Sequence, residues 1–77
     1  MKEVLEFIAR NLVDDPDAVE VSEVQADSGG VTLRLTVAPE DRGKVIGRGG
    51  RIVRAIRAVV RASGARSGVH VSVEIVE

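Results

Sequence analysis

The sequence of 77 residues has no cysteine, no tryptophan and no tyrosine, and its one aromatic residue is Phe7. Without cysteine the chain has neither disulfides nor thiolate metal ligands. It has no apolar run long enough to span a membrane and no signal segment at its start, so we expect a soluble, cytoplasmic protein. We expect Phe7 to pack in the core, which excludes an aromatic surface for stacking nucleic-acid bases.

Acidic residues are missing from the middle of the chain. Between Arg42 and Arg66 there are eight basic residues and no acid, whereas the rest holds all twelve acids and only three bases. The net charge of −1 therefore hides a strong polarity, and a basic pole of this kind attracts polyanions. A solvated helix face is the alternative explanation, but it does not account for the lack of interleaved acids.

Hydrophobic periodicity divides the chain into helices and strands. The predicted elements are a helix over residues 2–13, a strand over 18–27, a strand over 31–37, a short helix from Pro39, a helix over 51–62 and a strand over 69–75. The alternation of the first strand changes phase, so we expect a bulge near Ser22–Glu23. Asp27–Gly30 predicts a hairpin turn, and Ser63–Gly64 predicts the end of the long helix.

Each predicted strand has one apolar face, and each predicted helix has one apolar stripe. The fold class that buries all of them is α+β, with two layers: a three-stranded mixed sheet and three helices on one face, in the order αββααβ. The first two strands form an antiparallel hairpin. Because no linker or internal repeat divides the sequence, we expect a single domain over residues 1–77.

A glycine cluster lies between the two later helices, with Gly47, Gly49 and Gly50 surrounding Arg48. Glycine costs chain entropy, so three in four positions indicate that a ligand must approach the backbone closely. A helix N-terminus that follows such a loop favours anions, because its free N–H groups point outward. The basic residues that could supply ionic contacts to a phosphodiester backbone are Lys44, Arg48, Arg51 and Arg54.

Two nucleotide-binding loops are excluded by their spacing. The mononucleotide loop requires G-x-x-x-x-G-K-[ST], and residues 43–50 lack both the Gly-Lys pair in place and the hydroxyl for magnesium. The dinucleotide loop requires G-x-G-x-x-G after a strand, whereas this loop follows a predicted helix. We therefore expect a polyanion backbone as the ligand, with no cofactor and no metal.

The run Val45-Ile46-Gly47-Arg48-Gly49-Gly50-Arg51-Ile52-Val53-Arg54-Ala55-Ile56 resembles the core of the KH domain, V-I-G-x-x-G-x-x-[IV]-x-x-[IL]. Gly47 and Gly50 match the glycines of its G-x-x-G loop, and Val53 and Ile56 match its apolar helix positions. The predicted element order is similar to the type II form of that fold. The resemblance covers the whole chain and is strongest to the small single-KH bacterial proteins of the KhpA (YlqC) family.

This resemblance implies an RNA-binding protein that holds single-stranded RNA at the glycine loop, with single-stranded DNA as the less favoured ligand. The RNA-binding residues are expected to be Lys44, Val45, Ile46, Gly47, Arg48, Gly49, Gly50, Arg51 and Arg54. Val45, Ile46 and Val53 are candidates for an apolar floor under the bases and equally for the core. The family also implies an RNA-chaperone role, a homodimer or a heterodimer with the KH protein KhpB (Jag), and a role in cell-wall homeostasis and cell elongation.

Two other function classes remain open. A protein-interaction or dimerisation module with weak nucleic-acid binding would use the small stripe Ala55, Ala58 and Ala62, or the polar face of the sheet. An enzyme is the least favoured class. The only histidine, His70, alternates outward, and the sequence has no metal-ligand spacing, carboxylate-rich pocket or activated nucleophile.

Overall fold

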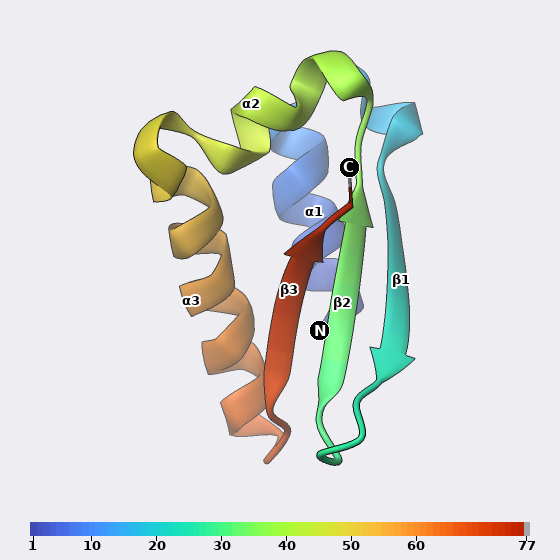
Figure 1. The fold of residues 1–77 in the computed structure, drawn as a ribbon, viewed down its shortest axis with the longest axis vertical. Helices are drawn as coiled ribbons and strands as arrows, with labels where there is room; N and C mark the ends of the chain where they lie inside the picture. The colour runs from blue at the N-terminus through green and yellow to red at the C-terminus, as the bar shows by residue number, and fades with distance from the viewer. Residues whose placement is uncertain (77) are drawn as a thin grey trace.

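A computed structural model describes residues 1–76, and its three helices cover one face of a three-stranded sheet (Figure 1). The elements are α1 (Lys2–Leu12), β1 (Glu20–Gln25), β2 (Val31–Thr36), α2 (Arg42–Ile46), α3 (Arg51–Arg66) and β3 (Val71–Ile75), with short 3-10 turns at Pro16–Ala18, Pro39–Asp41 and Arg48–Gly50. The predicted α+β architecture and the order αββααβ are confirmed. Within residues 1–76, no helix has the length and apolar character needed to cross a membrane.

The central strand of the sheet is β2, which pairs antiparallel with β1 and parallel with β3. Its side chains alternate, so that Leu33 and Leu35 are completely buried beneath the helices while Arg34 is exposed on the open face. The completely buried large apolar side chains come from both layers: Leu5, Leu33, Leu35, Val45, Val60 and Val71. Burial of each leucine or valine contributes about 1.5–3 kcal/mol, so this contact between sheet and helices is the main stabilising feature.

The expected bulge in β1 is wrong, because β1 and β2 pair without interruption from Glu20↔Thr36 to Gln25↔Val31. The strand is also shorter than the predicted span of residues 18–27. The change of phase in the sequence has another cause, since Val24 lies on the open face with 45% of its surface exposed. Beyond Val21 neither face of β1 is buried, so burial does not enforce a regular alternation there.

The expectation that Phe7 packs in the core is also wrong, because its side chain is 70% exposed. The buried residues of α1 are Leu5 and Ala9, four positions apart on the side that faces the sheet. Phe7 lies midway between them in sequence and therefore about 200° around the helix, on the solvent side. The prediction of a helix with one apolar stripe is confirmed for α1. Which side of this helix is buried depends on where the helix meets the sheet.

The long helix α3 does not end at Ser63–Gly64 but continues to Arg66. Gly64 is buried, and a Cβ atom on it would lie 2.5 Å from Val71 Cγ2 and 2.8 Å from the carbonyl oxygen of Val69. The end of the helix is instead marked by Gly68, with φ +73°, whose N–H donates to the carbonyl of Ala65 at 3.0 Å. Gly64 therefore serves close packing of α3 against β3.

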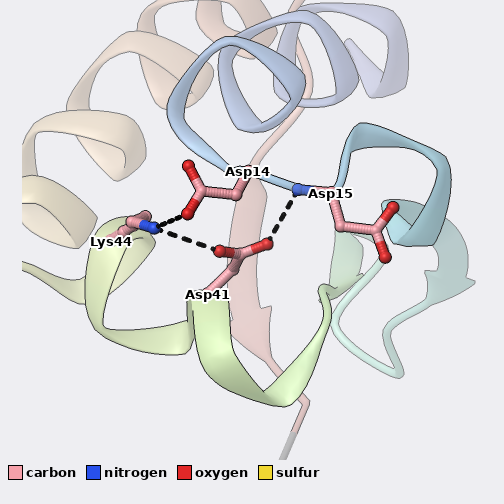
Figure 2. Close-up of polar contacts among 4 residues, drawn as sticks. All are labelled: Asp14, Asp15, Asp41 and Lys44. Carbon is pink, nitrogen blue, oxygen red and sulfur yellow. Dashed lines mark hydrogen bonds and ion pairs between the residues drawn. The ribbon is translucent and has the colours of Figure 1, made fainter.

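A polar clamp formed by Asp14, Asp15, Asp41 and Lys44 joins the segment after α1 to α2 (Figure 2). The backbone N–H of Asp15 donates to Asp41 Oδ2 at 3.1 Å, and Lys44 Nζ lies 3.4 Å from Asp41 Oδ1. Lys44 also donates to Asp14. Because Asp41 is only 2% exposed, its charge requires these partners, and the clamp holds α2 in place before the glycine loop.

The pKa of Asp41 reflects this environment. Removal of the carboxylate from water raises its pKa, but the hydrogen bonds from the backbone N–H groups of Asp15 and Asp14, together with Lys44, outweigh that effect. The net result is a pKa below the usual value for aspartate. The ionised form of Asp41 therefore stabilises the fold, and its protonation weakens the clamp.

Substitution of Gly64 by alanine is expected to destabilise the protein by about 1–3 kcal/mol, because the added methyl group overlaps Val71 and the backbone of Val69. Urea unfolding followed by circular dichroism measures the change. Gly43→Ala is the matched control, since Gly43 also lies in a helix and a Cβ there meets no atom within 4 Å. The control should be neutral or stabilising by about 0.5–1 kcal/mol. Equal behaviour of the two variants would contradict the packing role of Gly64.

Replacement of Asp41 by asparagine is expected to lower the midpoint of urea unfolding at about pH 7. The native pKa is depressed, so the stabilisation by Asp41 is complete above the unfolded pKa of about 4 and is lost as the pH falls through the native value. The difference between wild type and Asp41→Asn should therefore shrink towards about pH 3. The control Asp17→Asn alters an exposed carboxylate that forms no ion pair inside residues 1–76. It should leave the midpoint of urea unfolding unchanged at both pH values. A constant difference at all pH values would speak against the clamp.

Candidate nucleic-acid interface

The glycine loop lies between α2 and α3, at the end of the molecule away from the β1–β2 turn (Figure 1). All three of its glycines have positive φ: Gly47 at 76°, Gly49 at 65° and Gly50 at 77°. Side chains rarely adopt these conformations, so the backbone path itself requires glycine. The N–H of Gly50 donates to the carbonyl of Gly47 at 3.1 Å and closes the turn.

The glycines of the loop differ in what surrounds them. A Cβ on Gly47 would lie 2.6 Å from Ile52 Cγ1 and 2.9 Å from the backbone nitrogen of Ile52, so Gly47 lets the loop fold back on α3. A Cβ on Gly49 would meet no atom within 4 Å, and Gly49 is exposed. The loop therefore exposes its backbone to solvent at Gly49, whereas at Gly47 it packs against Ile52.

Three arginines surround this exposed backbone. Arg48 lies in the loop, and Arg51 and Arg54 lie in the first turns of α3; all three are exposed. Arg54 bends back towards the loop, with Nη1 at 3.6 Å from the position of a Cβ on Gly50. No side chain within residues 1–76 caps the N-terminus of α3, so its first N–H groups add positive potential at the same place.

The arginines of the basic pole are not neutralised by acids inside the described part of the chain. Its arginines form no ion pair within residues 1–76, although Arg10 pairs with Glu6 at 3.2 Å and Arg34 pairs with Glu74 at 3.5 Å. These arginines are Arg42, Arg48, Arg51, Arg54, Arg57, Arg61 and Arg66. Arg48, Arg51, Arg54, Arg61 and Arg66 are exposed, so their charge is available to a ligand at the surface.

Two of the predicted site residues lie elsewhere. The Val45 side chain is completely buried in the core, so it supports α2 and does not reach the surface. Lys44 is held by Asp14 and Asp41, and the hydrogen bond to Asp14 is the main reason that its pKa is raised. Ile46 is half-buried at the end of α2, next to the loop, and Val53 is 7% exposed.

Arg57 was absent from the predicted site and lies close to it. It is half-buried, and its Nε donates to the carbonyl oxygen of Val73 at 3.2 Å, which links α3 to β3. The sequence carried one signal for this contact, the spacing of three residues from Arg54, but it did not reveal which strand lies beside the helix.

The arrangement suits binding rather than catalysis. The exposed backbone at Gly49 and the guanidinium groups around it make a site for phosphate oxygens. Within residues 1–76 there is no group of three or more histidine or carboxylate side chains placed to hold a metal ion. The geometry therefore offers electrostatic and hydrogen-bond contacts to an extended polyanion.

Comparison with known proteins agrees with this geometry. The sequence profile of the family described as KhpA/KhpB, KH domain, matches residues 2–75. The RNA-binding protein KhpA of Clostridium acetobutylicum is 53% identical over 99% of this chain and 100% of its own length. The RNA-binding protein KhpA of Chlamydia trachomatis is 46% identical over 100% of this chain and 97% of its own.

A crystal structure of Aquifex aeolicus Era is similar in fold, with a TM-score of 0.68 at 16% identity. The match covers 96% of this chain and 29% of the Era chain. The profile and the full-length relatives together show that the chain belongs to the KhpA/KhpB family of KH domains.

Proposed function

We propose that the protein binds single-stranded RNA and holds the sugar-phosphate backbone against Gly47–Gly50. The observation that carries this proposal is the exposed backbone at Gly49, surrounded by arginines that have no acidic partner within residues 1–76. KH domains clamp about four nucleotides with this loop. The relatives named RNA-binding protein KhpA, which match over the full chain, support the same ligand. As a KH domain the protein is a binding module and not an enzyme.

The roles of the site residues follow from their positions. Arg48, Arg51 and Arg54 contact phosphate oxygens, and Ile46 offers an apolar surface beside the loop. Lys44 holds α2 in place through the polar clamp, and Val45 holds it through its packing in the core. With about three phosphates neutralised, the logarithm of the binding constant falls against the logarithm of salt concentration with a slope of about −2.

Base selectivity in this proposal is low. The lone aromatic residue, Phe7, lies on α1 and not at the loop, so bases are held by aliphatic contact and hydrogen bonds. Weak, unselective binding of single strands suits an RNA chaperone in the cytoplasm. Pairing with a second KH protein such as KhpB, in a role in cell-wall homeostasis and cell elongation, would add affinity through two linked sites.

The double variant Arg48→Asp/Gly49→Asp is expected to abolish RNA binding in a gel-shift assay while the circular dichroism spectrum stays unchanged. The reversed charge repels phosphate, and aspartate adopts the conformation of Gly49 (φ 65°, ψ 18°) more readily than most residues. Nothing within 4 Å of Gly49 obstructs the new side chain.

The matched control is Ser28→Asp/Gly29→Asp in the β1–β2 turn. Gly29 also has positive φ, at 88°, and open space around it. The control adds acidic residues at the other end of the molecule and should retain RNA. Retention of RNA by the loop variant would remove the glycine loop from the mechanism.

A second candidate function, self-association, is favoured by an apolar groove between α1 and α3. The groove has a volume of about 420 Å³ and is lined by Ile8, Leu12, Arg51, Ile52, Ala55, Ile56 and Val59. Val59 in its lining is 51% exposed, and Ala55, Ala58 and Ala62 are exposed as well. Two copies related by a two-fold axis can each place Val59 in the groove of the other, so we propose a homodimer with KhpB as the alternative partner.

Val59→Asp is expected to make the protein monomeric, because a buried charge at the centre of the contact has no partner. Sedimentation velocity over a concentration series measures the change. Val24→Asp is the matched control, since Val24 is an exposed valine on the open sheet face. A wild-type protein that stays monomeric at all concentrations, or an equal effect of both variants, would rule out this dimer.

A further inference from the structure

The outer strand β1 has a free backbone edge. Just beyond this strand, the N–H of Ala26 donates to the carbonyl of Gly30 at 2.9 Å, in line with the register of β1 and β2. Bonded and non-bonded pairs alternate along an antiparallel ladder, so every second residue of β1 bonds to β2. The residues in between have N–H and C=O groups that point away from the sheet; they are Val21, Glu23 and Gln25. Within residues 1–76 no further strand pairs with this edge (Figure 1).

A groove of about 360 Å³ runs beside this edge. Lys2, Glu6 and Arg10 of α1 line one wall, and residues 19–22 of β1 line the other. Residues on both faces of β1 take part, because alternate side chains of a strand point to opposite faces. The groove therefore follows the edge of the strand and leaves room for an extended segment next to it.

The charge along this edge is negative. Residues 14–27 contain six acids and no base, the reverse of residues 42–66. Asp14 is engaged with Lys44, but Glu20 and Glu23 on β1 are exposed and form no ion pair within residues 1–76. An extended segment with basic side chains would meet opposite charges at both positions.

The bases beside the groove do not cancel this charge. Arg10 pairs with Glu6 at 3.2 Å, and Arg34 pairs with Glu74 at 3.5 Å. Both arginines are thus engaged, and Lys2 is the remaining base of the groove lining.

A second copy of this chain does not suit the edge. Two β1 strands side by side would bring Glu20 and Glu23 of both copies together, and acids on an edge strand act against such pairing. A basic segment turns the same acids into attractive partners. Basic extended arms are typical of proteins that bind nucleic acids.

We propose that the free edge of β1 binds an extended basic segment of another protein, which adds a fourth strand to the sheet. The backbone of the segment bonds to Val21, Glu23 and Gln25, and its lysine or arginine side chains pair with Glu20 and Glu23. Val24, which is 45% exposed, contacts an apolar residue of the segment. Because β2 separates β1 from β3, this site is distinct from the proposed RNA site at the glycine loop.

Amide hydrogen exchange followed by NMR tests the proposal, with an octapeptide that alternates lysine and valine as the probe. The amides of Val21, Glu23 and Gln25 are expected to exchange more slowly when the peptide is added, since each gains a hydrogen bond. The same peptide with its four central peptide nitrogens methylated keeps its charge and should give no protection. A peptide with glutamate in place of lysine should not bind.

Two variants separate the contribution of charge from that of the backbone. Glu20→Lys is expected to weaken peptide binding about fivefold, because it replaces attraction by repulsion. Gln25→Pro should weaken it by a similar factor of about five, since it removes an outward N–H that the pairing with β2 does not use. The matched controls are Glu40→Lys, at an exposed acid outside β1, and Gln25→Ala, which keeps the N–H. Both controls should bind like the wild type.

Protection of these three amides without peptide, increasing with protein concentration, would show that a second copy covers the edge and would overturn the proposal. Equal protection by the methylated peptide, or equal losses for Glu20→Lys and Glu40→Lys, would also overturn it. None of these outcomes affects the proposed RNA binding, which is measured with the loop variant.

Discussion

β2 and β3 lie side by side and run in the same direction, and this parallel pairing shapes the functional end of the molecule. Parallel neighbours cannot be joined by a tight turn, so the chain must leave the end of β2, cross the sheet and return to the start of β3. That crossing consists of α2, the glycine loop and α3. The loop is its corner, and Gly47 allows the corner to close on Ile52. The backbone offered at Gly49 therefore results from sheet topology.

The positive and negative charges of the chain are separated between this crossing and the rest of the fold. The arginines from Arg42 to Arg66 occupy the crossing. Within residues 1–76 the acids lie in α1 and the segment after it, in the β1–β2 hairpin, in the turn Pro39–Asp41 and in β3. Where the two groups meet, Lys44 joins Asp14 and Asp41 and stabilises the position of α2. One base of this region thus serves the fold, while the arginines stay available at the surface. This division lets a protein with a net charge of −1 present a polyanion site.

The two flanks of α3 serve different partners in the proposed functions. The flank towards β3 carries Arg54, Arg57 and Arg61, and the flank towards α1 carries Val59 and the apolar groove. The two sites meet at Arg51, which belongs to the proposed RNA site and also lines the groove. The proposed dimer carries one RNA site on each copy. Two weak sites in one particle gain affinity without new contacts, provided that one RNA reaches both.

The order of elements, the glycine loop and the basic pole could be predicted from the sequence, because hydrophobic periodicity, backbone preference and charge are local properties of the chain. The exposure of Phe7, the continuous register at Val24 and the packing role of Gly64 depended on contacts between segments far apart in sequence. The same holds for the bond from Lys44 to Asp14 and from Arg57 to Val73. Periodicity could not predict these contacts, since it defines which residues share a face but not which neighbour covers that face.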